Sequence, residues 1–178
     1  PQRPAPPAPS FLVVLGVAQD GGSPQAGQPQ EPGWHDSAMR RHATSLALID
    51  GLALDRATPV LDGGGGRSTL GDDLLARGYT DLSVLDLSES ALAQARDRLG
   101  AAGATVAWHV ADVMNAALPD AHYGLWHDRA VFHFLVDDAA RAAYVAQARR
   151  ALRPGGHAII ATFAPDGPEK CSGLPVRR

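Results

Sequence analysis

Beyond residue 58 the chain alternates between short apolar runs and longer segments whose apolar residues recur every three or four positions. Short continuous apolar runs are typical of strands buried on both faces, and the longer spacing is typical of helices with one apolar face. Regular alternation of the two indicates an α/β domain with a mainly parallel, doubly wound sheet and helices on both faces. The expected strands cover residues 59–61, 82–87, 105–112, 123–128 and 157–163, and helices are expected from about Leu70, after Ser88 and over 138–152.

The first 57 residues do not share this pattern. Residues 1–10 are rich in proline and predict an extended arm. Residues 11–18 form an apolar run of the buried-strand type, and residues 44–51 form a second run that we expect to be its antiparallel partner. We therefore divide the chain into a Pro-rich disordered arm (1–10), a small N-terminal β segment (11–57) and an α/β domain (58–178).

Composition narrows the classes of function. The 178 residues are 45% hydrophobic and 20% charged, with a formal net charge of -3. This balance is typical of a globular protein and gives no electrostatic reason to expect binding to nucleic acid or to an anionic membrane. No apolar run is long enough for a transmembrane helix. Cys171 is the only cysteine, which excludes an internal disulfide and favours the reducing cytoplasm.

The most informative stretch joins the first strand of the α/β domain to its first helix. Four glycines, residues 63–66, follow Asp62 directly. Glycine permits a sharp reversal with positive φ and lets a ligand approach the bare backbone. Ser68 and Thr69 are candidate caps for the helix that follows, and the start of that helix adds free N–H groups and the positive end of its dipole. The sequence therefore predicts a ligand-binding turn.

Three of the expected strands end in an aspartate, at Asp62, Asp86 and Asp112. In an open parallel sheet, ligands bind beyond the carboxyl ends of the strands, so we expect these acids to converge there. Asp86 lies 24 residues after Asp62, close to the spacing of about 20 for an acid that accepts the ribose hydroxyls of an adenosine ligand. Asp112 could accept the adenine amino group while the Val113 N–H donates to the ring. The pattern predicts an adenosine site.

The same residues distinguish between adenosine ligands. The dinucleotide fingerprint G-x-G-x-x-G has no match in the glycine turn, because its last position falls on Ser68 or Thr69. Asp62 would also lie beside the negative charges of a pyrophosphate. A ligand with a sulfonium and an ammonium group, and no phosphate, is favoured by the same carboxylate.

Five motifs, in order and at these separations, resemble the class I S-adenosylmethionine-dependent methyltransferases, in particular the type-12 group. They are Asp62–Ser68, Val84–Ser88, Val110–Val113, Trp126–Leu135 and Leu152–Ala164. The resemblance covers about residues 59–178 and implies a Rossmann-like sheet with strand order 3-2-1-4-5, counted from residue 59, and S-adenosyl-L-methionine as the cofactor. The cofactor-binding residues that it implies are Asp62, Gly63, Gly64, Gly65, Gly66, Asp86, Leu87, Asp112, Val113 and His127.

The reaction that the resemblance implies is in-line displacement of the methyl group from sulfur by an O, N, S or C atom of a small molecule or a protein side chain. Alignment of the reacting atoms and partial exclusion of water would supply most of the catalysis. His127 and Asp128 are the candidate catalytic residues, since either could remove a proton. A structural role, such as pairing of Asp128 with Arg129, is the reading that we favour, and His133 is expected to pack on a helix. The Asp-Pro-Pro-Tyr motif that adenine or glutamine amide methylation would require is absent.

Residues 11–50 are similar to the opening strands of metallo-β-lactamase-fold proteins of the PqqB type, through the stretch Leu15–Gln25. The zinc motif His-x-His-x-Asp-His of that family has no counterpart here. His35 and His42 are seven residues apart, a spacing that does not fit the motif, so we expect no metal site.

The methyltransferase family usually continues into two further strands after the fifth, whereas this sequence stops shortly beyond it and lacks an initiator Met, as expected of a fragment. Since a bare parallel edge is an aggregation liability, we expect residues 11–17, with 46–49, to cover apolar surface, with the edge of the fifth strand as the candidate place. Two other functions stay open, a nicotinamide-dependent oxidoreductase and a non-catalytic truncated fusion that keeps only the cofactor-binding fold. The sequence does not indicate the methyl acceptor or the oligomeric state.

Overall fold

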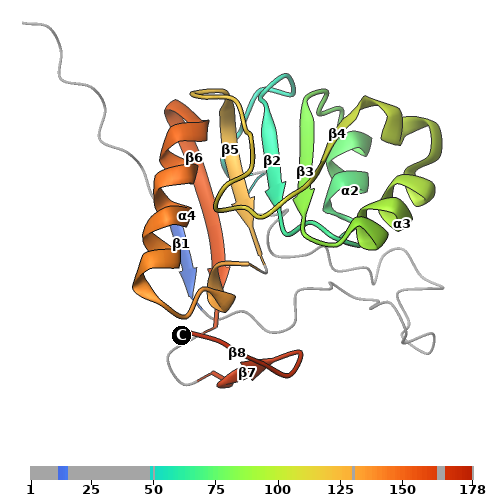
Figure 1. Cartoon of the computed structure of the whole chain (residues 1–178). Coiled ribbons are helices and arrows are strands. Elements are labelled where there is room, and N and C mark those ends of the chain that lie inside the picture. Colours follow the sequence, from blue (N-terminus) through green and yellow to red (C-terminus); the bar gives the residue numbers. More distant parts are fainter. Residues whose placement is uncertain (1–11, 16–48, 50, 130, 164–166, 178) are drawn as a thin grey trace, which may run out of the picture.

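The computed structural model describes residues 12–15, 49, 51–129, 131–163 and 167–177. Within this part of the chain, six strands form one sheet in the order β1-β6-β5-β2-β3-β4, and each neighbouring pair is parallel (Figure 1). The strands are β1 (Leu12–Leu15), β2 (Val60–Gly63), β3 (Leu82–Asp86), β4 (Val106–Val110), β5 (Tyr123–Asp128) and β6 (Leu152–Thr162). The helices are α2 (Leu70–Ala76), α3 (Glu89–Leu99) and α4 (Asp138–Ala151), with short 3₁₀ turns η3 (Gly100–Thr105) and η4 (Phe132–Phe134).

The topology confirms the expected fold. Read from the β4 edge, strands β4, β3, β2, β5 and β6 give the order 3-2-1-4-5 when they are counted from residue 59. The order reverses between β2 and β5, so the carboxyl ends of these strands flank the switch point of the sheet, which is where open α/β sheets bind their ligands.

The N-terminal strand β1 occupies the β6 edge. Leu12 pairs with Ile159 and Leu15 with Thr162, in parallel register. The expectation that this apolar run covers the edge of the fifth strand is confirmed for residues 12–15. Its expected antiparallel partner falls mostly outside the described residues, and of that run Ile49 and Gly51 are helical rather than extended. A short apolar run fits a buried strand or a buried helix equally well, which explains the error.

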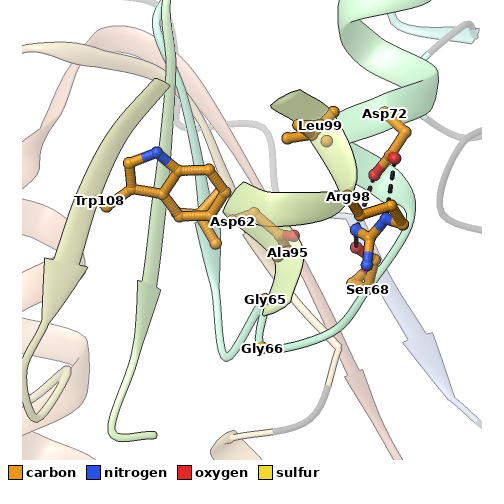
Figure 2. Close-up of a pocket in the computed structure, with 11 residues that line it drawn as sticks. Asp62, Gly65, Gly66, Ser68, Asp72, Ala95, Arg98, Leu99 and Trp108 are labelled. Carbon is orange, nitrogen blue, oxygen red and sulfur yellow. Dashed lines mark hydrogen bonds and ion pairs between the residues drawn. The ribbon is translucent and has the colours of Figure 1, made fainter. Parts of the chain in front are cut away.

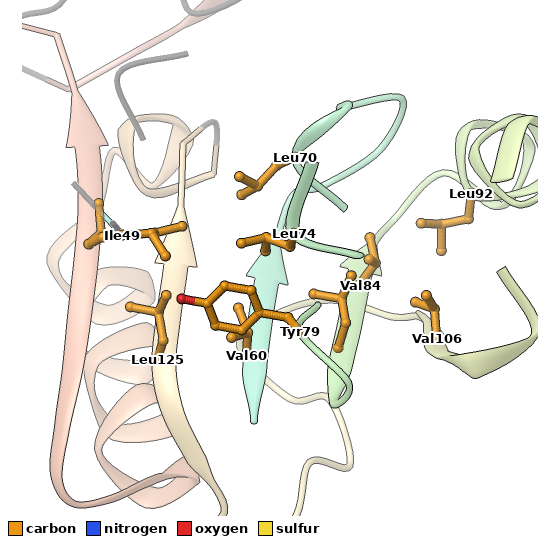
Figure 3. Close-up of a cluster of buried hydrophobic side chains, with 11 residues drawn as sticks. Ile49, Val60, Leu70, Leu74, Tyr79, Val84, Leu92, Val106 and Leu125 are labelled. Carbon is orange, nitrogen blue, oxygen red and sulfur yellow. The ribbon is translucent and has the colours of Figure 1, made fainter. Parts of the chain in front are cut away.

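One face of the sheet packs on α2 and α3. Because side chains alternate along a strand, Val60 and Val84 face the same way. They pack with leucines of both helices in a buried cluster, here called the α2–α3 core (Figure 3). Ile49, which precedes the α/β domain in sequence, is fully buried in this cluster. Its members are Ile49, Val60, Leu70, Leu74, Tyr79, Leu82, Val84, Leu92, Val106, Leu125 and Ile159.

The opposite face packs on α4. Leu61 and Leu85, one residue along from the valines above, belong to a second buried cluster, the α4 core. Tyr144, Ala148 and Ala151 form the apolar stripe of α4, at the three- and four-residue spacing of a helix face. Helices therefore cover both faces of the sheet, as the alternating pattern predicts.

Two local features differ from the expected elements. Strand β6 begins at Leu152, so it includes the Arg-Pro-Gly-Gly segment that lies before the expected strand start at residue 157. Beyond β6, β7 (Lys170–Cys171) and β8 (Leu174–Pro175) form a small antiparallel hairpin. After the hairpin, the Arg177 N–H donates to the carbonyl of His133 at 2.8 Å, and the Arg177 guanidinium contacts the Asp138 carboxylate. The tail of the chain is thus fastened to η4 and to the start of α4.

No helix in the described ranges has the length and apolar character needed to cross a membrane.

Candidate active site

The glycine turn folds over the end of β3. Gly64 and Gly66 have φ values of +71° and +42°, the left-handed region that glycine adopts at little cost. The N–H groups of Gly64 and Gly65 both donate to the Leu85 carbonyl, at 2.7 and 3.2 Å. The run of glycines thus allows a reversal that most side chains would prevent.

The turn also lies against two carboxylates. A Cβ at Gly65 would lie 2.5 Å from Val84 Cγ1 and 2.8 Å from Asp62 Oδ2, and a Cβ at Gly66 would lie 2.9 Å from Asp86 Oδ2. Contacts this short leave no room for a side chain at either position. The turn is therefore packed directly against the acids of β2 and β3.

The helix after the turn begins with a local hydrogen bond. Ser68 Oγ accepts from the Leu70 N–H at 3.1 Å, whereas Thr69, at the N-cap position, makes no side-chain cap bond. Of the expected Ser/Thr pair, only the serine therefore satisfies a helix N–H.

Asp62 and His127 form a buried pair beneath the turn. They are register partners on β2 and β5, and His127 Nδ1 lies 2.7 Å from Asp62 Oδ1. The side chain of His127 is 1% exposed and that of Asp62 is 4% exposed. His127 Nε2 is also buried and makes no hydrogen bond within the described structure. Asp62 is therefore engaged inside the protein.

Asp86 keeps part of its carboxylate at the surface. Its Oδ1 accepts from the Ser88 N–H at 2.8 Å, while its Oδ2 lies beside Gly66. Ser88 in turn caps α3, since its Oγ accepts from the Ala91 N–H. The next residue, Leu87, is 74% exposed. The turn from β3 into α3 therefore presents an acid and an apolar side chain at the same edge.

Asp112 ends the third of the expected strands. It lies two residues beyond Val110, which is the register partner of Asp86. Its Oδ1 accepts from the Met114 N–H at 2.9 Å. The Val113 side chain belongs to the α4 core, so a ligand could meet this residue only through its backbone. Asp62, Asp86 and Asp112 thus come to one edge of the sheet, with Asp62 the most buried.

Asp128 lies on the α4 side of the sheet. It is 0% exposed and accepts hydrogen bonds from the N–H groups of Val131 and Phe132 at 2.8 and 3.1 Å. Tyr144 OH donates to it at 2.6 Å and accepts from Trp126 Nε1 at 2.8 Å. Burial, followed by the negative charge of Asp128, raises the pKa of Tyr144 well above its usual value. These contacts give Asp128 a structural role, holding the turn that leads into η4.

His133 lies in η4 between two aromatic rings. The ring centres of Phe134 and Phe163 are 4.2 and 5.0 Å from that of His133. Burial lowers the pKa of His133 below its ordinary value of 6.5, so the imidazole is neutral at neutral pH. The expected packing role fits this environment, although the aromatic neighbours of His133 lie in η4 and just after β6.

A second set of contacts near the turn has no counterpart among the sequence-based predictions. Arg98, near the end of α3, binds both carboxylate oxygens of Asp72 and the carbonyls of Arg67 and Ser68. A small pocket lies beside these groups, between the turn, Trp108 and Leu99 (Figure 2). Its volume of about 10 Å³ is enough for roughly one water molecule. A cofactor would therefore have to bind on the open edge of the turn and not in this pocket.

Within the described ranges, no group of three or more His, Cys, Asp or Glu side chains is placed to hold a metal ion. His35 and His42 lie outside these ranges.

Comparison with known proteins identifies the family. A family model described as a methyltransferase domain matches residues 60–156, which is more than half of the chain. No curated protein sequence matches the chain. The expected similarity of residues 11–50 to metallo-β-lactamase-fold proteins receives no support from these comparisons.

Solved structures agree on the fold. An S-adenosylmethionine-dependent methyltransferase from Mesorhizobium loti is 26% identical, with a TM-score of 0.52 over 65% of this chain and 51% of its own. A protein named as a methyltransferase from Bacillus halodurans C-125 is 23% identical, with a TM-score of 0.59 over 70% of this chain and 53% of its own. The CcbJ methyltransferase from Streptomyces caelestis is 23% identical, with a TM-score of 0.56 over 65% of this chain and 47% of its own.

The chain therefore spans about half the length of these structures. Its sheet order, its glycine turn and the matched segment agree with one another. The chain belongs to the methyltransferase-domain family, class I enzymes whose methyl donor is S-adenosylmethionine.

Proposed function

We propose that this chain binds S-adenosylmethionine at the carboxyl edge of β2, β3 and β4 and, within its whole protein, transfers the methyl group to a small molecule or a protein side chain. The observation that carries the proposal is the close approach of Gly66 to Asp86, where a bare backbone at positive φ meets a partly exposed carboxylate. The residues present suit this cofactor, because the carboxylates of Asp62 and Asp86 lie beside the glycine turn and favour a ligand that carries a sulfonium and an ammonium group.

Each residue of the edge has a task in this proposal. Asp86 accepts the ribose hydroxyls, since a carboxylate has an oxygen for each of two O–H donors. Leu87 covers one face of the adenine ring, and Asp112 with the Val113 backbone meets the polar edge of the adenine. The backbone of residues 63–66 holds the methionine part of the cofactor. When bound, the cofactor supplies an electrophilic methyl group on a positively charged sulfur.

The buried pair sets the charge beneath the turn. Asp62 contributes negative charge close to where the cationic part of the cofactor would lie, and its bond to Nδ1 fixes the orientation of the His127 ring. His127 is the candidate to border the methyl group, because it lies near the end of β5, opposite the Asp62 that precedes the glycine turn. Asp128, fully buried and bonded to Tyr144, is the weaker candidate for moving a proton.

Charge and composition support the remaining parts of the proposal. The formal net charge of -3 supports a neutral or cationic acceptor over nucleic acid or an anionic membrane. A single cysteine in 178 residues supports a reducing compartment, and we place the protein in the cytoplasm.

Calorimetric titration with S-adenosylhomocysteine tests the proposal. Wild-type protein should bind it, and Asp86→Ala should weaken binding by at least about tenfold, the equivalent of one charge-assisted hydrogen bond. Asp97→Ala, an acid on the exposed surface of α3, should leave the affinity unchanged. Titration with NADH should show no binding. If wild-type protein binds NADH and not S-adenosylhomocysteine, the oxidoreductase alternative replaces this proposal.

A further inference from the structure

One arginine connects the glycine turn to both helices beside it. Arg98 Nε and Nη2 donate to the two oxygens of Asp72 at 2.9 and 2.8 Å, a bidentate pair between the end of α3 and the first turn of α2. Nη2 also donates to the Ser68 carbonyl at 2.7 Å, and Nη1 to the Arg67 carbonyl at 3.4 Å. Figure 2 shows the guanidinium between Asp72 and Ser68, beside the turn.

The two carbonyls come directly after the last glycine. Arg67 and Ser68 follow Gly66, and the Ser68 N–H bonds back to the Gly65 carbonyl at 2.6 Å. A shift of these carbonyls would therefore move the glycines that approach the carboxylates of Asp62 and Asp86. Glycine has little intrinsic preference to hold such a shape, so the turn depends on contacts from outside itself.

A guanidinium group can bind the Asp72 carboxylate and the two carbonyls at once, and an ammonium group is less suited to this. A planar fork can bind a carboxylate with two parallel N–H groups and still direct further N–H groups at neighbouring acceptors, whereas a lysine ammonium acts as a point charge. The hydrogen bond to Asp72 raises the pKa of Arg98 above its ordinary value, so the charge is permanent. The side chains of Arg98 and Asp72 are 34% and 30% exposed, so the pair itself contributes little to global stability.

We propose that Arg98, held by Asp72, is a positioning residue that keeps the glycine turn in the shape that binds the cofactor. This inference rests on the proposed function for its effect on binding, but its effect on the turn is independent of any ligand. Arg98 touches neither the open edge nor the acids that end the strands, so it acts through the backbone of residues 65–68.

The test compares Arg98→Gln with Arg98→Lys and with a matched control, Arg150→Gln. Arg150 also joins a carboxylate and backbone carbonyls, those of Asp120, Ala116 and Leu118, but it lies on α4 away from the turn. By calorimetry, Arg98→Gln should raise the Kd for S-adenosylhomocysteine by about tenfold or more, since small misplacements of binding groups cost this much. Arg98→Lys should recover only part of the affinity, and Arg150→Gln should stay within about twofold of wild type.

Hydrogen exchange of the free protein gives a readout that needs no ligand. Amides of residues 64–70 should exchange faster in Arg98→Gln and not in Arg150→Gln. Wild-type affinity in Arg98→Gln, or unchanged exchange in the turn, would overturn the inference. Equal loss of affinity in Arg150→Gln would overturn it as well, because the effect would then be general destabilisation. Failure of wild-type protein to bind S-adenosylhomocysteine would overturn the proposed function, and the exchange result would still decide the role of Arg98 in the turn.

Discussion

The two halves of the proposed ligand-binding edge use their polar groups in opposite ways. At the end of β5, His127 and Asp128 are 1% and 0% exposed, and both are engaged inside the protein. At the ends of β3 and β4, Asp86 and Asp112 accept hydrogen bonds from their own turns and stay partly exposed. Asp128 thus holds the backbone of the turn into η4, whereas Asp86 and Asp112 remain open to the ligand that we propose. Substitution of Asp128 should therefore mainly reduce stability, and substitutions at the ends of β3 and β4 should mainly reduce ligand binding.

The largest expected effect is loss of stability at Asp128. Asp128→Ala would leave two part-buried N–H groups and the buried Tyr144 hydroxyl without this acceptor. Breaking a buried charged network costs about 3–5 kcal/mol, which urea denaturation would measure. Asp137→Ala, which removes an exposed carboxylate that caps α4, should cost only about 1 kcal/mol. Equal losses of stability in Asp128→Ala and Asp137→Ala would contradict the structural role of Asp128.

The glycine turn connects the two halves, so a change there should affect both properties. Gly65→Ala would press a Cβ against Val84 and Asp62 and should cost about 1–3 kcal/mol in urea denaturation. Binding of S-adenosylhomocysteine should weaken in the same variant. Gly71→Ala is the control, because its Cβ would meet Leu82 only at 3.4 Å within a helix, where alanine is favoured over glycine. A Gly65→Ala variant as stable as Gly71→Ala would show that the turn is loosely packed.

A smaller effect is expected at the hydroxyl of Tyr144. Tyr144→Phe removes the donor to Asp128 and the acceptor of Trp126 Nε1, and should cost about 1–2 kcal/mol near neutral pH. The pKa of Tyr144 is raised in the folded protein from an ordinary value of 10.0. A raised pKa means that the folded state keeps the phenol proton more tightly than the unfolded state does. This stabilisation is complete below pH 10 and is lost as the pH rises through the folded-state pKa.

Denaturation across alkaline pH would measure that loss. Wild-type stability should fall more steeply above pH 10 than that of Tyr144→Phe. Identical slopes in the two proteins would remove Tyr144 as the cause.

The smallest effect on stability is expected at Leu87, in the open half. This side chain is 74% exposed, so Leu87→Ser should change the free energy of unfolding by less than about 0.5 kcal/mol. Loss of an apolar contact with the adenine would still weaken S-adenosylhomocysteine binding several-fold, about 1 kcal/mol. Val145→Ser, at an exposed position of α4, should change neither property. A Leu87→Ser variant that is less stable but binds S-adenosylhomocysteine with full affinity would contradict the role of Leu87 in ligand binding.

Local patterns predicted most of the fold because the strands and helices carry their own periodicity. The glycine turn and the aspartates at or near the ends of β2, β3 and β4 needed only neighbouring residues to be recognised, whereas the strand order came from the resemblance to the methyltransferase family. Contacts across long separations were different. The bond from Arg98 to Ser68 joins residues 30 positions apart, and the bond from Tyr123 to Ser83 joins residues 40 apart. No local signal distinguishes Arg98 from Arg96 on the same helix.

The burial of Asp62 and His127 also could not be predicted from the sequence pattern. Asp62 and His127 lie 65 positions apart, and they meet only because β2 and β5 are neighbours in register. Once the strand order is assumed, this pairing could be inferred from two polar residues at equivalent positions of adjacent strands. Ile49 is helical and is buried in the α2–α3 core, and a short apolar run does not distinguish a buried helix from a buried strand.

The position of β1 has a consequence for folding. Leu12 to Leu15 pair with residues 159 to 162, so β1 can join the sheet only after a segment far along the chain has become available. Contacts between such distant segments slow folding, because a long loop must close before they can form. Until residues 159 to 162 are available, the apolar run of β1 lacks its native partner, and this is the interval in which a chaperone would have most to protect.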